Sequence, residues 1–223
     1  MSEHLEILLM RHGRSRADDE QVIEGRYDAP LTDLGRAQAE ARANEFLAAD
    51  SVFDAIVASP LKRAHETAEI VGRALDTAVV VDPGWMERDN GPVAGLTVEE
   101  VGERYPLPDY LSPFDDLVPT AREGESSGES AWALQARVIG ALQRVVQRGP
   151  GRYLVVAHGG SLSAALRCVV GAPLAARTRG SGFPWATPGT RDSSSRHGST
   201  AGCSASSDMA RINDPPSKTR ERT

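Results

Sequence analysis

The sequence has 223 residues, a net charge of −6 at neutral pH, 40% hydrophobic residues and two cysteines. This length suits one α/β domain with a core of its own, and two cysteines supply neither a disulfide framework nor a metal-binding set. The negative charge argues against a nucleic-acid-binding protein, and the lack of a targeting segment or a membrane-length apolar run predicts a cytoplasmic protein without a membrane partner.

The first half of the chain predicts two strand–helix pairs. Residues 7–10 form a continuous apolar run, which is typical of a buried parallel strand, and residues 32–48 follow as a helix rich in Ala and Glu. The second strand is expected at residues 52–58. Ser59 followed by Pro60 is typical of a helix start, because serine caps free N–H groups and proline suits the first helical position.

The second half repeats this alternation around an inserted segment. Strands are expected at residues 78–81 and 153–157, while residues 129–147 and 161–170 show helical periodicity. Residues 85–125 hold several Pro and Gly and no long periodic run, which is typical of an inserted cap. Strands that alternate with helices predict a three-layer α/β/α sandwich with a mostly parallel central sheet.

The composition changes after residue 177, so residues 1–177 are expected to form the domain and residues 178–223 a polar tail. Ser, Gly and Pro make up 18 of the 45 residues from 179 to 223. Such a composition disfavours a packed core, and the tail is expected to be poorly ordered or diverged. Cys203 in the tail is expected to be exposed, whereas Cys168, in an apolar stretch before it, is expected to be a small buried hydrophobe.

Basic and imidazole side chains follow three of the predicted strands. Arg11 and His12 come directly after the first strand, Arg63 follows the second, and His158 follows residues 153–157. Because open parallel sheets gather ligands at the carboxyl ends of their strands, these side chains are expected to line one cationic pocket. A lone Arg-His-Gly is weak evidence for catalysis, but two such histidines with two arginines are hard to explain structurally.

This set of side chains predicts phosphoryl transfer. Arg11 and Arg63 suit a phosphate, because the planar guanidinium donates two parallel hydrogen bonds to it. The same charges disfavour an imidazolium, which keeps His12 neutral and able to attack phosphorus. His158 is expected to donate to a phosphoryl oxygen and stabilise the transition state.

Two further expectations concern the proton donor and a metal. Glu87 is expected to act as general acid beside Trp85 and Met86, with Asp89 as the nearby competitor for that role. A metal site is the main chemical rival, but no two histidines are four residues apart on a predicted helix and no third ligand stands out. We therefore expect no metal and no cofactor.

The chain resembles the histidine phosphatase superfamily, which has the phosphoglycerate mutase-like fold. The resemblance covers about residues 5 to 175 and rests on six blocks in order. These blocks are Leu9-Met10-Arg11-His12-Gly13 with Ser15, residues 25–39, Ser59-Pro60-Leu61-Lys62-Arg63-Ala64 with Thr67-Ala68, residues 87–91 with Gly95-Leu96-Thr97, Gly128-Glu129-Ser130 with Arg137-Val138, and Val156-Ala157-His158-Gly159-Gly160.

The resemblance implies a role for each matching residue. His12 is the phosphorylated nucleophile and Glu87 the acid. The phosphate is held by Arg11, Arg63 and His158, with Ser15 and Arg26 lining the pocket less directly. By resemblance the chain needs no metal and acts on a small phosphorylated metabolite. The oligomeric state stays open, and a homodimer through an edge of the sheet is the arrangement common in this fold class.

Two departures from the family pattern bear on these expectations. Asp18 stands where the signature often has Asn, and it would repel an anionic substrate unless Arg14, Arg16 or Arg26 neutralises it. The last strands of the family are not recognisable after residue 177, so the C-terminal edge of the sheet is either incomplete or diverged. Residues 211–214 faintly resemble the family's usual ending.

Three functions remain open at this point. A phosphomonoester hydrolase, with water as the final phosphoryl acceptor, is favoured because the insert at 85–125 is modest in length. A cofactor-dependent phosphoglycerate mutase would use the same intermediate. A weakly active phosphate-binding regulatory protein is the alternative from another class.

Overall fold

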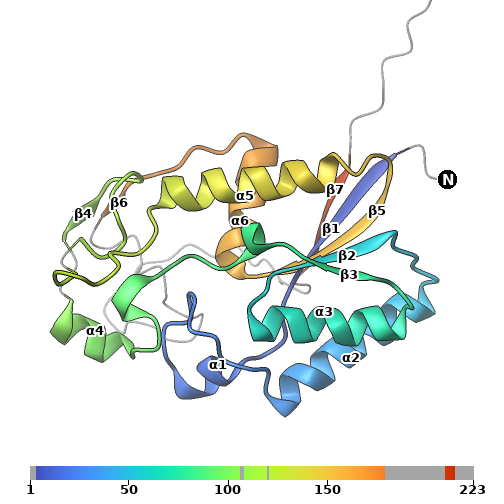
Figure 1. Ribbon diagram of the computed structural model, residues 1–223, viewed down its shortest axis with the longest axis horizontal. Helices are drawn as coiled ribbons and strands as arrows, with labels where there is room; N and C mark the ends of the chain where they lie inside the picture. The colour runs from blue at the N-terminus through green and yellow to red at the C-terminus, as the bar shows by residue number, and fades with distance from the viewer. Residues whose placement is uncertain (1–3, 106–107, 120, 179–208, 214–223) are drawn as a thin grey trace, which may run out of the picture.

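A five-stranded sheet forms the centre of the computed structural model, which describes residues 4–105, 108–119, 121–178 and 209–213 (Figure 1). Its strand order is β3-β2-β5-β1-β7. The strands are β1 (Leu5–Arg11), β2 (Ala55–Ala58), β3 (Val79–Val81), β5 (Gly151–Ala157) and β7 (Met209–Asn213).

Four of these strands run parallel and end at the same edge of the sheet. In the register of β1 with β5, Arg11 lies opposite Ala157, and in that of β2 with β5, Ala58 lies opposite Val156. The residues that follow each strand therefore emerge side by side. This alignment confirms the expected mostly parallel sheet and brings the predicted basic strand ends together.

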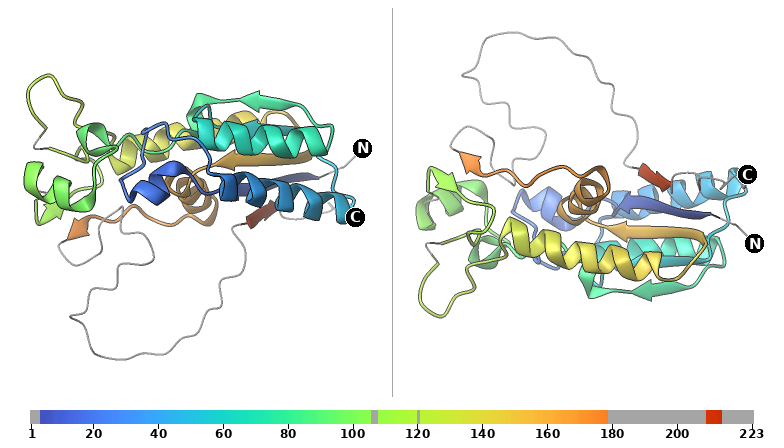
Figure 2. Two further views of the ribbon diagram at one scale, coloured as in Figure 1. Left: turned by 90° about the horizontal axis from the view of Figure 1, so that it is seen from below. Right: turned by 90° about the horizontal axis from the view of Figure 1, so that it is seen from above.

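Helices cover both faces of the sheet, as the three-layer prediction requires. One face packs against α5 (Ala131–Val146) and α6 (Gly159–Val170), and the other against α2 (Asp33–Ala48) and α3 (Lys62–Ala74) (Figures 1 and 2). Successive strand residues alternate between the two cores, because side chains of a strand point to opposite faces. Thus Leu9 packs with the α5 and α6 side, and Leu8 with the α2 and α3 side.

The inserted segment forms a small subdomain beyond the strand ends. It comprises the 3₁₀ helices η1 (Pro83–Trp85) and η2 (Gly91–Val93), the helix α4 (Val98–Arg104), and β4 (Tyr110–Leu111), which pairs with β6 (Arg177–Thr178). Its apolar cluster consists of Ile23, Val93, Val101, Tyr105, Leu117 and Val118. Trp85 packs instead in the main core, against the α5 side.

Three local predictions were wrong. The strand β2 begins at Ala55 rather than residue 52, and α3 begins at Lys62 with Leu61 as its N-cap, so Ser59 does not cap that helix. Cys168 is exposed, because it lies on the outward side of α6. The short helix α1 (Arg16–Glu20) was not predicted.

The edge of the sheet beside β1 is occupied. β7 pairs antiparallel with β1, with Leu9 opposite Ala210. The edge that the sequence left open is therefore completed by a strand from the tail, which overlaps residues 211–214, where the sequence faintly resembles the family's ending. Residues 179–208 and 214–223 of the predicted tail, including Cys203, lie outside the described residues. In the described part of the chain, the helices are too short or too polar to cross a membrane.

Candidate active site

His12 lies where β1 leaves the core, and its ring is held in one tautomer. The Nδ1 atom is 2.7 Å from the carbonyl oxygen of Gly13. Because a carbonyl only accepts, Nδ1 carries the proton and Nε2 has the lone pair. Arg63 confirms this arrangement, since its Nε–H donates to Nε2 at 3.2 Å. A Cβ on Gly13 would collide with the backbone of Gly35, so glycine is required where β1 meets the start of α2.

The surroundings of His12 keep it uncharged. Burial, which has the largest effect, and the neighbouring charge of Arg63 together lower its pKa from 6.5 to about 3. The side chain is therefore a neutral imidazole at physiological pH, and the electron pair on Nε2 is unprotonated and accepts the hydrogen bond from Arg63. This is the protonation state that a nucleophile needs.

Arg63 is the buried cation of the site, with no exposed surface. Two of its nitrogens donate to backbone carbonyls, Nη1 to Tyr27 and Nη2 to Gly25, both at 2.9 Å. Its position at the first turn of α3 places it beside the end of β1. Arg11 is the more open cation, since 45% of its side chain is exposed.

His158 is the second imidazole, and it is fully buried at the N-cap of α6. Its ring centroid lies 5.0 Å from that of His12. Burial holds its pKa well below 6.5, and the charge of Arg63 acts in the same direction. Both predicted histidines are thus neutral and adjacent.

Ser59 orients His158, a role that the sequence did not reveal. Its hydroxyl accepts from the N–H of Leu61 at 3.3 Å and lies 2.8 Å from Nε2 of His158. Because the backbone N–H already donates to it, the hydroxyl can give its proton to Nε2, which leaves the imidazole proton on Nδ1. That Nδ1 atom is buried and has no partner among the described residues. It is therefore available as a donor to a bound anion.

Glu87 follows η1 and reaches the start of α6. Its carboxylate accepts from the N–H of Gly160 at 2.9 Å and from that of Arg88 at 2.7 Å. A Cβ on Gly160 would collide with this carboxylate. Glycine two residues after His158 therefore allows the acid to approach the second histidine.

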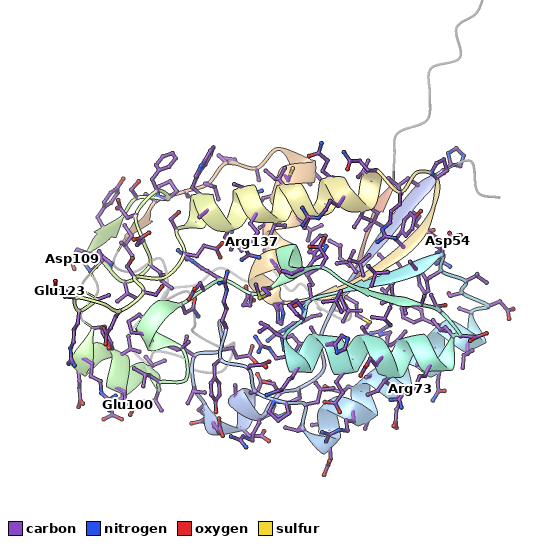
Figure 3. All side chains as sticks on the ribbon, viewed as in Figure 1. Asp54, Arg73, Glu100, Asp109, Glu123 and Arg137 are labelled. Atoms are coloured by element: carbon purple, nitrogen blue, oxygen red, sulfur yellow. The ribbon has the colours of Figure 1, made fainter. Side chains whose placement is uncertain are left out.

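Arg137 holds the segment that carries Glu87. It reaches from α5 toward the link between η1 and η2 (Figure 3). It donates to the carbonyls of Gly84 and Met86 at 2.9 Å and of Glu87 at 3.3 Å. Glu129 accepts from the same guanidinium at 2.7 Å. The contact between Arg137 and Glu129 gives a structural role to the two charged residues of the block Gly128-Glu129-Ser130 with Arg137-Val138.

Glu24 enters the pocket from the loop between α1 and α2, and sequence reasoning missed it. One of its oxygens is 3.4 Å from Nε of Arg63, and the other is 3.8 Å from both Nε2 of His12 and Nη2 of Arg11. The hydroxyl of Ser15 lies 2.5 Å from it. No motif marked this glutamate, because its contacts depend on how the loop folds back.

Asp18 caps a helix instead of pairing with one of the predicted arginines, although its charge acts on Arg14. The Asp18 carboxylate accepts the backbone N–H of Ser15 at 2.8 Å and so caps α1. Arg14 pairs with Asp19, Arg16 with Glu20 and Arg26 with Asp89. None of the three forms an ion pair with Asp18 in the described structure. Asp89 is tied to Arg26, while Glu87 reaches toward His158.

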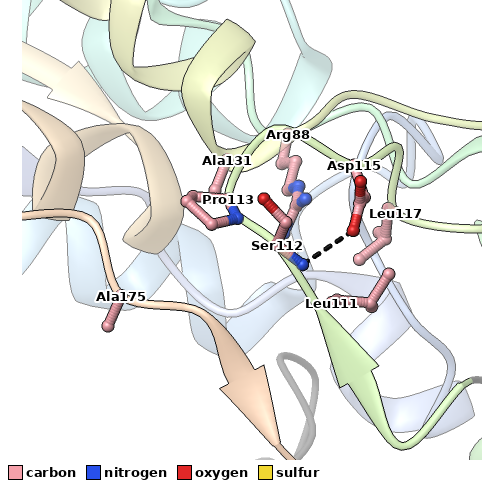
Figure 4. A pocket seen from close by; sticks show the side chains of 8 residues that line it. All are labelled: Arg88, Leu111, Ser112, Pro113, Asp115, Leu117, Ala131 and Ala175. Atoms are coloured by element: carbon pink, nitrogen blue, oxygen red, sulfur yellow. Dashed lines mark hydrogen bonds between the residues drawn. The ribbon is translucent and has the colours of Figure 1, made fainter.

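A separate cavity lies between the cap, α5 and the segment after α6 (Figure 4). Its volume is about 10 Å³, which suits a single water. Its lining residues are Arg88, Leu111, Ser112, Pro113, Asp115, Leu117, Ala131 and Ala175. It is too small for a substrate and contains none of the predicted site residues. Within the described ranges, no group of three His, Cys, Asp or Glu is placed to hold a metal ion.

The two neutral histidines make stability depend on pH. The folded-state pKa of His12 lies below that of the unfolded chain, so the unfolded chain binds more protons in acid. The stabilisation is complete above about pH 6.5 and is lost as the pH falls toward 3. Between about pH 7 and 5, we expect His12 to account for a loss of about 2 kcal/mol in unfolding free energy.

Urea unfolding at several pH values measures this effect. His12→Asn is expected to show a shallower decline than the wild type over that range, whatever its absolute stability. Parallel declines for the two proteins would contradict a neutral, buried His12.

Comparisons with known proteins identify the family of this chain. The sequence model of the histidine phosphatase superfamily (branch 1) matches residues 7–182. The chain is 34% identical to the uncharacterized phosphatase PhoE of Bacillus subtilis, over 74% of this chain and 77% of that protein. It is 32% identical to the probable phosphoglycerate mutase GpmB of Cronobacter sakazakii, over 78% and 79% of the two chains.

Solved structures give the same result. YhfR of Bacillus stearothermophilus superposes with a TM-score of 0.64 at 29% identity, covering 76% of this chain and 82% of that one. A mycobacterial glucosyl-3-phosphoglycerate phosphatase in complex with VO3 gives a TM-score of 0.63 at 26% identity, covering 75% and 81%. The region matched by the family's sequence model, residues 7–182, includes His12, Arg63 and His158. The chain belongs to branch 1 of the histidine phosphatase superfamily.

Proposed function

We propose that this protein is a metal-independent phosphomonoester hydrolase that works through a phosphohistidine on His12. The observation that carries the proposal is the neutral imidazole of His12, whose Nε2 lone pair faces the buried cation Arg63. A neutral imidazole beside a guanidinium can both attack a phosphoryl group and have its product stabilised.

In the first step, Nε2 of His12 attacks phosphorus. The P–N bond forms as the bond from phosphorus to the ester oxygen breaks. Arg11 and Arg63 neutralise the transferring group, and His158 donates from Nδ1 to one of its oxygens. Glu87, protonated for this step, gives its proton to the leaving alkoxide.

In the second step, water attacks the phosphohistidine. Glu87, now a carboxylate, takes a proton from that water as the new P–O bond forms and the P–N bond breaks. Inorganic phosphate leaves, and His12 returns to its neutral form with the proton still on Nδ1. The backbone bond from Nδ1 to Gly13 persists through the cycle, so the same nitrogen reacts each time.

The proposed substrate is a small phosphorylated metabolite. Among the relatives, one is named a phosphatase and another a probable phosphoglycerate mutase. Proteins named for each of the two reactions are therefore similar in sequence to this chain. A mutase would pass the phosphoryl group from His12 to a sugar acid rather than to water. The two reactions differ in the acceptor, which makes them experimentally separable.

Hydrolysis of p-nitrophenyl phosphate in the presence of a chelator tests the proposal. We expect release of phosphate that is unchanged by removal of divalent metal ions. Activity that appears only as isomerisation of a phosphoglycerate, dependent on a bisphosphorylated primer, would replace the hydrolase with a mutase. Phosphate binding without either activity would favour the regulatory protein.

Glu87→Gln separates acid catalysis from the rest of the site. With an alkyl phosphate, whose leaving alkoxide needs a proton, we expect kcat to fall by about 10²- to 10⁴-fold. With p-nitrophenyl phosphate, whose leaving group is stable as an anion, the fall in the rate of the first step is expected to be much smaller. Burst and steady-state rates with the two substrates measure the difference. If the rate of the first step fell equally with the two substrates, Glu87 would be excluded as the proton donor. Glu99→Gln, which changes an exposed glutamate of α4, is the matched control.

A further inference from the structure

The carboxylate of Glu24 lies among the groups that are proposed to bind phosphate. It is 3.4 Å from Arg63 and 3.8 Å from the reacting Nε2 of His12, and only 18% of its side chain is exposed. Burial lowers the pKa of Arg63, and Glu24 is the carboxylate that most strongly opposes this effect. Glu24 therefore acts on the same cation as an incoming anion would.

A phosphoryl group bonded to Nε2 of His12 must lie within contact of this carboxylate. Two negative groups in contact repel, and the repulsion is strong where water is largely excluded. A single proton between a carboxylate oxygen and a phosphoryl oxygen changes the repulsion into a short charge-assisted hydrogen bond. A phosphomonoester has its second pKa near about 6, so that proton is available in mild acid.

We propose that Glu24 and the phosphoryl group of the substrate share one proton when bound, so that this chain selects the singly protonated form of a phosphomonoester. This inference rests on the proposed hydrolase function and adds a substrate preference to it. The shared proton can enter with the substrate or be taken up from solution. The bound complex holds the same number of protons in both cases.

Three other groups around Glu24, namely His12, His158 and Asp18, are less suited to hold this proton. Burial and the charge of Arg63 keep both His12 and His158 neutral. Asp18 is engaged by the backbone of Ser15. The charged or titratable groups that face Glu24, or act on the same buried cation, are Arg11, His12, Asp18, Asp28, Arg63, Glu87 and His158.

Binding of inorganic phosphate near pH 8 tests the inference without any turnover. Calorimetry in two buffers of different ionisation enthalpy gives the number of protons taken up per phosphate bound. We expect uptake of about one proton by the wild type, because free phosphate is then mostly a dianion. Glu24→Gln is expected to take up clearly less and to bind phosphate at least about tenfold more tightly, since an amide can donate to a dianion.

Glu40→Gln, which changes an exposed glutamate of α2, is the matched control and should behave as the wild type. Uptake near zero by the wild type would overturn the inference, whether or not the variant folds. Equal proton uptake or equal phosphate affinity in the wild type and Glu24→Gln would also overturn it.

The pH profile of kcat/KM gives a second readout. For the wild type, we expect kcat/KM for p-nitrophenyl phosphate to fall about tenfold per pH unit above about pH 6, as the monoanion disappears. Glu24→Gln should instead keep its activity as the substrate becomes a dianion. If hydrolysis occurs and both proteins have the same profile, the inference fails while the proposed function stands. If no phosphoenzyme or hydrolysis is found, the proposed function fails, and proton uptake on phosphate binding still decides the role of Glu24.

Discussion

Replacing His12 by alanine is expected to abolish the phosphoenzyme and to lower kcat by at least about 10³-fold. Loss of a nucleophile removes the covalent route entirely, and only binding and electrostatic stabilisation remain to assist direct attack by water. The wild type, quenched during turnover of a ³²P-labelled substrate, should carry one acid-labile phosphate. The alanine variant should carry none.

His65→Ala is the matched control for this experiment. His65 lies on α3, near the site in sequence, but its side chain is partly exposed and faces Glu69 at 3.9 Å. We expect full labelling and near-normal kcat from that variant. An acid-labile adduct that survives His12→Ala would place the nucleophile elsewhere.

Replacing Arg63 by lysine is expected to lower kcat/KM by about 10²- to 10³-fold, although the positive charge is retained. A lysine cannot reproduce the fork that donates at once to His12, Tyr27 and Gly25. The carbonyl of Gly25 is buried and that of Tyr27 is partly buried, and a buried carbonyl left without a donor costs about 1–3 kcal/mol. We therefore also expect a loss of about 2–4 kcal/mol in unfolding free energy.

Kinetics with p-nitrophenyl phosphate and urea unfolding measure the two effects on the same preparation. Arg73→Lys makes the same change on an exposed part of α3 and should leave both quantities near the wild-type values. If Arg63→Lys lowered the urea midpoint while kcat/KM stayed unchanged, Arg63 would be a structural residue only.

Much of the candidate site follows from chain order and the rules of parallel sheets. Apolar runs before Arg11 and His158 predict two buried strands, and parallel strands end at one edge. The register of β1 with β5 then brings the two imidazoles together. Glu87 was expected from its place after a short strand, and its carboxylate does reach the backbone two residues beyond His158.

Predictions from local sequence patterns failed where contacts between distant parts of the chain decide the outcome. Ser59 before Pro60 is typical of a helix cap, but its hydroxyl contacts His158, which is 99 residues away in the chain. Cys168 lies in an apolar sequence, but it faces outward on α6 and is exposed. Composition alone also could not show that residues 209–213 pair with β1.

The sequence by itself determined the four parallel strands, the layers and the types of side chain in the candidate site, because these depend on apolar periodicity and on what lies at each strand end. Only the tertiary structure decided which polar atoms meet: the proton on Nδ1 of His12, the orientation of His158 by Ser59, and the carboxylate of Glu24 beside Arg63. The physical reason is that burial removes water as a partner, so each donor and acceptor must find another protein group. Those partners come from distant parts of the chain, and the fold of the loops selects them.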